Sequence, residues 1–498
     1  MFASSQKIVF NHFYRLRHDR TRSCILSPSL TQKTDPDFVN PNLIVKIHPI
    51  YAMIFSFFSF PIELGRAIGE IAEFLDITEE QAEKLIVPFL NRGEPLRTTY
   101  GGTTNQFPKN ILIDASKAIV EPIEYRPEQF AYDTLDFHTE RINRAPATMG
   151  FMVTNRCGTD CIYCYADKSV RAEPLPWERV RAMIREARKL GIVDITMLGG
   201  EFFLYKDWER LVETMNEEGF GIDFISTKLP LSESTIRKLK TYGIRLQISL
   251  DSLNAEKLVR ILKVGPDYAE RIERTIRLLE QYEITFQIAT VLTNLNDDIE
   301  NLDELHRFLA QFTNLRRWEI RVGFRSLYSR KDFDDFKITS DKITAVARWI
   351  EKIQQSTSIN ILWAPDTPEN YFQSTGGSRT FKGNRCSANY SNMVVLPDGR
   401  VTICEQLYWH PHFLIGDVRT QTLAEIWNSP RALALAALKK EDLRDVSVCK
   451  KCEMAEECLA YPNRCYADIL KGYGWENWDY PDPRCVKAPA LLQDLFHK

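Results

Sequence analysis

Two clusters of cysteine constrain this chain more than any other feature of its sequence. Three of its eleven cysteines fall within residues 157–164, and seven fall within residues 386–485. The N-terminus lacks the apolar core and small-residue cleavage site of a secretory signal, so we expect a cytoplasmic protein with reduced thiols. Clustered thiols in a reducing compartment usually bind metal rather than form a disulfide framework. The sequence therefore predicts metal centres in two separate parts of the chain.

The composition argues against two broad classes of protein. The 498 residues carry a net charge of −3, which is unlike a protein that binds nucleic-acid backbones through a basic surface. A transmembrane helix needs roughly 20 consecutive apolar residues. The longest apolar-rich stretch, residues 51–62, is much shorter. We therefore expect neither nucleic acid nor a membrane among the partners.

The first third of the chain predicts a poorly ordered N-terminal segment, a small folded module and a linker, in that order. Residues 1–35 are polar and basic, and we expect them to be poorly ordered. Residues 36–110 predict a small α+β module, with strands at 42–48 and 51–60 followed by two helices. Residues 111–146 are rich in turn formers and predict a linker.

Beyond this linker, strands alternate with amphipathic helices. The six predicted strands are residues 148–154, 194–198, 221–227, 246–250, 286–292 and 318–322. This alternation indicates an α/β fold whose parallel sheet is partly closed as a (β/α)6 barrel over residues 147–340. Residues 341–385 then form a bridging region, and residues 386–498 form an irregular, cysteine-rich domain.

Three cysteines share the loop that leaves the first barrel strand. Cys157, Cys161 and Cys164 have the spacing C-x3-C-x2-C. Three thiolates on one loop can bind three irons of a [4Fe–4S] cluster and leave the fourth iron open to a small molecule. The alternative is a zinc site, but the segment lacks the paired C-x2-C spacing and the fourth ligand of structural zinc. Barrel folds place their chemistry on loops of this kind.

This loop resembles the signature of the radical S-adenosylmethionine (radical SAM) superfamily, C-x3-C-x-aromatic-C. The resemblance implies a [4Fe–4S] cluster on the three cysteines and S-adenosylmethionine as the bound cosubstrate. It also implies that Gly199, Gly200 and Glu201, which follow the second strand, hold the methionyl amino group. The family often continues this motif with proline, whereas this chain has Phe202. A second departure is at the end of the third strand, where Thr-Asn-Gly is common and this chain has Ser226-Thr227-Lys228.

Other cosubstrate contacts follow from the same resemblance. Tyr163 would lie against the adenine, and Ser249 and Arg260 would contact the methionyl carboxylate. Asp251 completes the family's S-x-D motif at the end of the fourth strand. Alternative interpretations remain open: Asp251 as a helix cap and Arg260 as a solvated helix residue.

The downstream cysteines resemble the SPASM extension, which carries two auxiliary [4Fe–4S] clusters behind many peptide-modifying radical SAM barrels. The resemblance implies one cluster on four thiolates and a second with three visible thiolates. The proposed ligands are Cys449, Cys452, Cys458 and Cys485 for the first, and Cys386, Cys404 and Cys465 for the second. The gap of six residues after Cys458 departs from the usual three. A zinc ribbon is the alternative.

Two further functional features rest on weaker resemblances. Glu405 directly follows a proposed cluster ligand, where sulfatase-maturing relatives have a proton-accepting carboxylate; a surface carboxylate or helix cap is the alternative. Residues 36–95 resemble the peptide-recognition element of pyrroloquinoline-quinone biosynthesis, a small winged-helix-like fold that binds a leader peptide along a strand edge. Plain core packing is the alternative there.

Together these resemblances imply a radical SAM enzyme with three [4Fe–4S] clusters. Its substrate would be a ribosomally made precursor peptide with a leader, and its product a thioether or carbon–carbon crosslink or another side-chain modification. A flavodoxin or ferredoxin would supply electrons. Oxidation of a protein side chain, as in anaerobic sulfatase maturation, is an alternative. A non-catalytic iron–sulfur electron carrier is another, although a carrier has no use for a methionine pocket.

Overall fold

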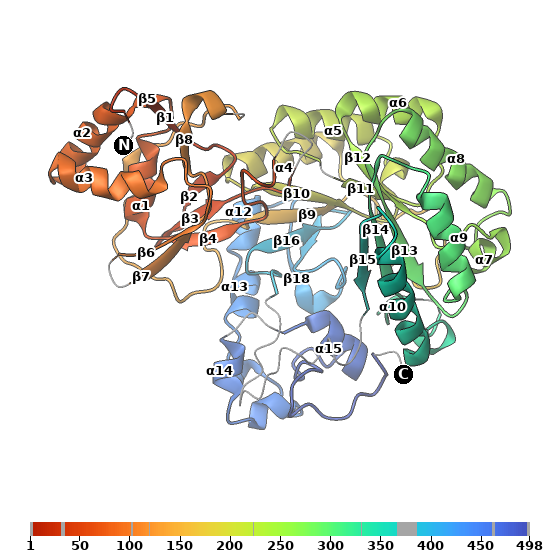
Figure 1. Ribbon diagram of the computed structural model, residues 1–498. Coiled ribbons are helices and arrows are strands. Elements are labelled where there is room, and N and C mark those ends of the chain that lie inside the picture. The colour runs from red at the N-terminus through yellow and green to blue at the C-terminus, as the bar shows by residue number, and fades with distance from the viewer. Residues whose placement is uncertain are drawn as a thin grey trace. The chain divides into compact units, whose positions relative to one another are not determined.

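The computed structural model describes residues 3–30, 35–100, 103–118, 120–222, 224–329, 331–365, 386–460 and 464–495 (Figure 1). The chain divides into two compact units. We call the first the N-terminal unit; it comprises Met1–Met149, Ile184–Ile195 and Glu218–Asp223. We call the second the barrel unit; it comprises Gly150–Met183, Thr196–Glu217 and Phe224–Lys498.

The N-terminal unit contains two three-stranded antiparallel sheets, a hairpin and three helices. One sheet has the order β5-β1-β8, the other has the order β2-β3-β4, and β6 pairs with β7. The strands are β1 (Lys7–Phe10), β2 (Arg15–His18), β3 (Ser23–Leu26), β4 (Ile44–Ile47), β5 (Ile62–Glu63), β6 (Leu96–Tyr100), β7 (Thr103–Phe107) and β8 (Leu112–Asp114). The helices are α1 (Pro49–Ser56), α2 (Leu64–Leu75) and α3 (Glu79–Ile86).

Two expectations for this unit were wrong. Residues 1–35, expected to be poorly ordered, contain β1, β2 and β3, and residues 111–146, expected to be a linker, contain β8 paired with β1. Strands of three or four residues are shorter than the window in which periodicity is informative, so polar neighbours masked them.

The apolar stretch at residues 51–60, predicted as a strand, is largely the helix α1. Pro49 stands in the first turn, and the His48 side chain accepts a hydrogen bond from the Ile50 amide at the helix N-terminus. A short apolar run does not distinguish a buried helix from a strand, and the proline and cap decide here. A capping box begins α3, where Thr78 and Gln81 bond each other's backbone amides.

Aromatic rings fill the core of the N-terminal unit. The ring centroids of Phe55 and Phe89 lie 5.1 Å apart, and those of Phe89 and Phe107 lie 4.8 Å apart, both edge to face. Tyr51 meets Phe107 at 4.8 Å in the same manner. These pairs tie α1 to the β6–β7 hairpin, with edge-to-face geometry adding to the hydrophobic gain.

The barrel unit contains a five-stranded parallel sheet in the order β11-β12-β13-β14-β15. Its strands are β11 (Phe224–Thr227), β12 (Arg245–Ser249), β13 (Phe286–Leu292), β14 (Leu315–Val322) and β15 (Ile361–Ala364). Helices cover the outer face of this sheet (Figure 1). The helices of this part are α5 (Trp208–Glu217), α6 (Glu233–Tyr242), α7 (Ala255–Leu262), α8 (Tyr268–Gln281), α9 (Ile299–Leu309) and α10 (Ser340–Gln354).

A second sheet joins the first barrel strands to the cysteine-rich part of the chain. It has the order β10-β9-β16-β17-β18. Its strands are β9 (Thr148–Met152), β10 (Asp194–Leu198), β16 (Asn392–Val395), β17 (Arg400–Thr402) and β18 (Leu414–Asp417). The helix α4 (Trp177–Lys189) connects β9 to β10, and α12 (Leu423–Trp427), α13 (Pro430–Ala436), α14 (Ala455–Leu459) and α15 (Tyr466–Tyr473) follow β18.

The six predicted barrel strands all occur, but the barrel does not end at residue 340. The expected bridging region, residues 341–385, includes α10 and the strand β15, which pairs with β14. A four-residue strand after a helix gave too weak a pattern to predict. The rest of that region, residues 366–385, lies outside the described residues.

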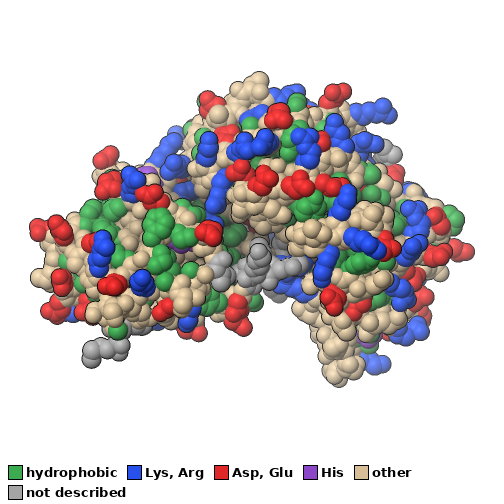
Figure 2. All heavy atoms as spheres, turned by 90° about the horizontal axis from the view of Figure 1, so that it is seen from above, with side chains coloured by type: hydrophobic (Ala, Val, Ile, Leu, Met, Phe, Trp, Pro, Cys, Tyr) green, Lys and Arg blue, Asp and Glu red, His purple; other side chains and the backbone are tan. Residues whose placement is uncertain are grey.

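The surface agrees with the small net charge of the chain. Acidic and basic side chains are interspersed over the face shown in Figure 2. Hydrophobic side chains also appear on the visible face of the N-terminal unit, at the left (Figure 2). Within the described ranges, no helix combines the length and the apolar character that crossing a bilayer requires.

A buried ion pair organises the second sheet of the N-terminal unit. Arg22 and Asp19 are both fully buried, and Arg22 Nε lies 3.1 Å from Asp19 Oδ2. The guanidinium also donates to the backbone carbonyls of Thr139 and Arg141. The pair thus ties the β2–β3 turn to the segment that precedes β9.

We predict that Asp19→Asn lowers the free energy of unfolding by about 3–5 kcal/mol, because it leaves the Arg22 charge buried and uncompensated. The lower stability should appear as faster hydrogen exchange of the backbone amides of residues 15–26. Glu80→Gln is the control, since the Glu80–Lys84 pair has side chains that are 76% and 71% exposed. Unchanged exchange in Asp19→Asn would contradict the prediction.

Candidate functional site

The loop after β9 carries three free thiols. Cys161 is buried, whereas Cys157 and Cys164 are half-buried. The hydroxyl of Thr159 lies 3.4 Å from Cys157 Sγ and 3.3 Å from Cys161 Sγ, so one side chain bridges two of the thiols. Burial raises the pKa of Cys161 to about 11. The loop therefore presents three soft sulfur donors in a largely dehydrated setting.

A lysine and a cavity border this loop. Lys168 Nζ donates to the Thr159 carbonyl at 2.9 Å and pairs with Asp160 at 3.2 Å. Burial opposes the charged form of Lys168, but the Cys164 and Cys157 thiols outweigh it and raise the pKa of this lysine. The adjoining cavity has a volume of about 280 Å³ and is lined in part by Cys161, Cys164 and Lys168.

The glycine turn after β10 packs directly against the cysteine loop. The Gly200 amide donates to the Thr154 carbonyl at 2.7 Å, and the Glu201 amide donates to the Arg156 carbonyl at 2.8 Å. A Cβ atom on Gly199 would lie 2.5 Å from the Thr154 oxygen, and one on Gly200 would lie 2.3 Å from the Arg156 oxygen. Glycine is therefore required here by the neighbouring backbone.

Glu201 is a buried carboxylate held by neutral donors. It is 2% exposed and accepts hydrogen bonds from Thr227 Oγ1 at 2.9 Å and from the Lys228 amide at 3.1 Å. Burial raises its pKa, and these hydrogen bonds oppose that shift. Among the described residues it makes no ion pair. Such a carboxylate is well suited to receive an ammonium group.

A second buried carboxylate links the cysteine loop to the barrel strands. The Tyr163 hydroxyl donates to Asp251 Oδ2, and the Val291 amide donates to Asp251 Oδ1 at 2.9 Å. Lys228 Nζ lies 3.9 Å from Asp251 Oδ2 and 5.3 Å from the centre of the Tyr163 ring. The aromatic residue of the loop, the end of β11 and the end of β12 thus meet at one place.

Lys228 is the site residue that sequence reasoning did not assign. Its amide bonds Glu201, its ammonium faces Asp251, and it acts electrostatically on Cys161. The sequence feature that could have identified it is its charge, because an uncharged residue is common at this end of the third strand.

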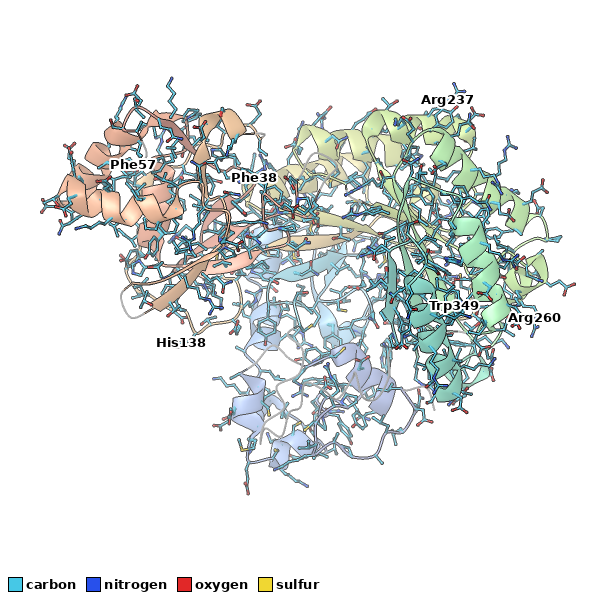
Figure 3. All side chains as sticks on the ribbon, viewed as in Figure 1. Phe38, Phe57, His138, Arg237, Arg260 and Trp349 are labelled. Carbon is cyan, nitrogen blue, oxygen red and sulfur yellow. The ribbon has the colours of Figure 1, made fainter. Side chains whose placement is uncertain are left out.

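The two residues expected at the methionyl carboxylate lie in different settings. Ser249 is 8% exposed and ends β12, two residues before Asp251. Arg260 is exposed on α7 and lies at the outer edge of the ribbon in Figure 3. In the part of the chain that the structure describes, Arg260 makes no hydrogen bond or ion pair. The structure therefore brings Ser249 and Asp251 together and leaves Arg260 at the surface.

Four downstream cysteines influence one another electrostatically. Burial raises the pKa of Cys449; Arg464 opposes this shift, and Cys485, Cys452 and Cys458 add to it. Cys458 lies on α14, and Cys485 accepts a hydrogen bond from the Lys487 amide at 3.4 Å. These are the four thiols that the sequence interpretation assigned to one centre.

The remaining three cysteines lie around Glu405 and Lys471. Burial raises the pKa of Cys404, and Glu405 and then Cys386 raise it further. Glu405 Oε2 lies 3.9 Å from Cys404 Sγ. Lys471, which is 6% exposed, acts electrostatically on both Cys404 and Cys465. Among the described residues, no three His, Cys, Asp or Glu side chains converge closely enough for a single metal ion.

Tyrosines occupy the space between the first cysteine loop and Cys404. Tyr165 is 37% exposed, yet desolvation of its hydroxyl raises its pKa to about 12, followed by the effects of Glu405, Cys164 and Cys404. Tyr328 and Tyr408 pack edge to face with centroids 5.2 Å apart. This aromatic region is flanked by thiols from both cysteine-bearing parts of the chain.

Comparison with known families identifies the two cysteine-bearing parts of the chain. Residues 151–307 match the radical SAM superfamily, and residues 386–453 match SPASM, an iron–sulfur cluster-binding domain. The chain carries a radical SAM domain followed by a SPASM domain. The family expected from the cysteine motifs is therefore confirmed, as is the expectation that the protein binds iron–sulfur clusters.

Curated relatives of the radical SAM domain have varied functions. The probable GTP 3',8-cyclase of Methanothermobacter marburgensis is 33% identical over 135 residues, which cover 27% of this chain and 44% of that protein. The chain thus spans less than half the length of that relative. The sporulation killing factor maturation protein SkfB of Bacillus subtilis is 24% identical over 331 residues, covering 65% of this chain and 74% of that protein.

A solved structure shares the fold over nearly the whole chain. The crystal structure of Streptococcus suis SuiB bound to the precursor peptide SuiA has a TM-score of 0.62 at 15% identity, and the match covers 96% of this chain and 100% of that chain. The expected α/β fold, with a radical SAM barrel followed by a SPASM domain, is therefore confirmed.

We predict that Tyr163→Phe destabilises the radical SAM domain by about 1–3 kcal/mol, because the buried Asp251 carboxylate loses a donor. Chemical denaturation of the whole chain measures the loss. Tyr242→Phe is the matched control: its hydroxyl donates to Glu213 at 2.7 Å in an exposed position, so water replaces the lost bond. Equal stability of the two variants would contradict the structural role of Tyr163.

Proposed function

We propose that this protein is a radical SAM enzyme that modifies a ribosomally made precursor peptide. The observation that carries the proposal is the buried Glu201 carboxylate, which has neutral donors on one side and stands on a turn packed against the three-cysteine loop. The similarity to SkfB, a maturation protein, and to SuiB, whose structure holds a precursor peptide, supports a peptide as the substrate.

The donor set of the first loop fits a cluster, since it offers three free thiols, while the Asp160 carboxylate of the same loop is paired with Lys168. When bound there by Cys157, Cys161 and Cys164, a [4Fe–4S] cluster and S-adenosylmethionine supply the 5′-deoxyadenosyl radical that removes hydrogen from carbon. Glu201 receives the methionyl ammonium as a charge-assisted acceptor. The burial of these groups keeps water away from a reactive intermediate.

The other residues of the site hold this arrangement in place. Gly199 and Gly200 let the turn approach the loop, and Tyr163 joins the loop to Asp251. Ser249 stands beside Asp251 at the strand end. Arg260, being exposed on α7, is assigned no contact with the cosubstrate.

The SPASM domain binds two auxiliary clusters in this proposal. One takes Cys449, Cys452, Cys458 and Cys485, and the other takes Cys386, Cys404 and Cys465. Glu405, 3.9 Å from the Cys404 sulfur, holds a substrate proton on its carboxylate as a general base. Electrons come from a cytoplasmic donor such as flavodoxin or ferredoxin.

The N-terminal unit binds the leader of the precursor in this proposal. Its sheet β2-β3-β4 has two edge strands, and an extended peptide adds to such an edge through backbone hydrogen bonds. Phe60 and Phe74 are 53% and 43% exposed in the same unit and offer apolar anchors. Phe57 packs edge to face against Phe74 with centroids 5.5 Å apart, which fixes one of these rings.

The direct test of this function uses a short peptide encoded beside the gene. Co-expression with the enzyme should change the mass of that peptide, by a loss of two hydrogens for a crosslink. The same co-expression with Cys157, Cys161 and Cys164 replaced by Ala should leave the peptide mass unchanged. An unchanged peptide with the active enzyme, together with turnover of a small molecule, would reject the peptide class.

We predict about twelve irons per chain after anaerobic reconstitution, from three [4Fe–4S] clusters. Replacing Cys157, Cys161 and Cys164 together by Ala should leave about eight, because one cluster loses all its ligands. Cys24→Ala is the control and should keep the full iron content, since Cys24 is a fully buried thiol of β3. About four irons together with one equivalent of zinc would reject the two auxiliary clusters.

We predict that Glu201→Gln weakens S-adenosylmethionine binding by about 1.5–3 kcal/mol, because a carboxylate facing an ammonium becomes neutral. Equilibrium binding to the reconstituted protein measures the change. Glu213→Gln, an exposed carboxylate on α5, should bind like the wild type. A dissociation constant for Glu201→Gln equal to that of the control would reject the assigned role.

A further inference from the structure

A cationic cavity lies wholly among residues of the N-terminal unit. Its volume is about 450 Å³, and its walls come from β2, residues 123–130, Arg144 and residues 188–192 at the end of α4. Its basic lining residues are Arg15, Arg17, His18, Arg144, Arg188 and Lys189. Among the described residues that line it, Glu124 alone is acidic, so the charge around the cavity is strongly positive.

Buried polar atoms on the wall of the cavity have no partner. Arg17 is 4% exposed, and its terminal nitrogens donate to the carbonyls of Pro146 and Ala145, both at 2.9 Å. Its Nε is buried without a hydrogen-bond partner, and so is Nδ1 of His18. Buried polar atoms are almost always hydrogen-bonded in folded proteins, so two unpartnered atoms at one cavity leave hydrogen-bonding capacity for a ligand.

The nearby carboxylates are already engaged. Glu124 pairs with Arg126 at 2.8 Å. Asp19 pairs with Arg22, and its Oδ1 accepts the backbone amides of Asn143 and Arg144 at 2.8 and 2.9 Å. Neither carboxylate therefore neutralises the cavity.

Two arginines face the cavity without a counter-ion. In the described ranges neither Arg15 nor Arg188 makes an ion pair, and Arg15 has one long hydrogen bond, 3.4 Å to the Tyr14 carbonyl. Burial lowers the pKa of Arg15 to about 10; Tyr125 opposes the shift, and Arg188 adds to it. Arg15 and Arg188 are both half-buried, and two guanidiniums that repel each other across a cavity favour an anion between them.

We propose that this cavity binds carboxylate side chains of an acidic segment in the precursor peptide, an inference that rests on the proposed function. An arginine guanidinium binds a carboxylate through two parallel hydrogen bonds. Clusters of arginine residues are a recurring means of recognising acidic motifs. Leu16, Ile123 and Leu190 supply apolar wall between the cations, which suits a peptide with acidic and apolar residues.

The test measures binding of a fluorescent peptide rich in glutamate and leucine to the full chain by anisotropy. The matched peptide with glutamine in place of glutamate should bind at least tenfold more weakly. The double variant R15Q/R188Q should weaken binding of the glutamate peptide by about 10- to 100-fold, the effect of removing charge-assisted hydrogen bonds. Neither arginine neutralises a buried carboxylate, so the variant is expected to fold, and its melting temperature verifies this.

The control variant R92Q/R97Q removes the same charge from exposed arginines of the same unit. It should bind like the wild type; equal weakening by both double variants would mean diffuse attraction and overturn the site. Inorganic phosphate and pyrophosphate compete in parallel. Displacement of the peptide by either at micromolar concentration would overturn the peptide assignment in favour of a phosphate ligand.

Cleavage of S-adenosylmethionine without peptide separates the two proposals. Normal cleavage by R15Q/R188Q with lost peptide binding supports the cavity as a binding site. If the wild type cleaves S-adenosylmethionine but does not bind the glutamate peptide, only the cavity proposal fails. If it binds the peptide but neither cleaves the cosubstrate nor binds iron, the proposed function fails and the cavity stands.

Discussion

The site depends on one backbone contact, the packing of the glycine turn after β10 against the loop after β9. Two amide–carbonyl hydrogen bonds, from Gly200 to Thr154 and from Glu201 to Arg156, hold the turn there. This contact sets both the course of the cysteine loop and the place where the Glu201 carboxylate is buried. Residues far apart in sequence thus acquire a fixed spacing without any side chain between them.

Buried and half-buried charges are satisfied in several ways in the two units. In the barrel unit, carboxylates at Glu201 and Asp251 are held by hydroxyl and amide donors and by one lysine at 3.9 Å. In the N-terminal unit, Arg22 is neutralised by Asp19, whereas Arg15 is not neutralised by any described residue. Uncompensated buried charge is costly for a protein alone, and such groups are often retained for binding.

Sequence reasoning predicted the loops that carry the candidate site better than it predicted the elements around them. The cysteine spacings and the glycine motif follow strands, so their loops and their order were predictable from periodicity and spacing. The short strands β1 to β3, the helix α1 and the strand β15 were not, because four-residue strands and short apolar runs carry little pattern. Lys228 and the cavity beside Arg15 depend on residues brought together by tertiary structure, which no local pattern reports.

The shared sheet of the barrel unit has a consequence for how such chains are divided. Strand β16 of the SPASM domain is the neighbour of β9, the strand that leads to the first cysteine loop, and a Cβ on Gly150 would lie 3.2 Å from the Val394 side chain. The two family matches are therefore separate in sequence but continuous in hydrogen bonding. A chimera joined at residue 386 would have to recreate this interface side chain by side chain. We therefore expect that recombination between related genes exchanges the barrel and its cysteine-rich extension together rather than separately.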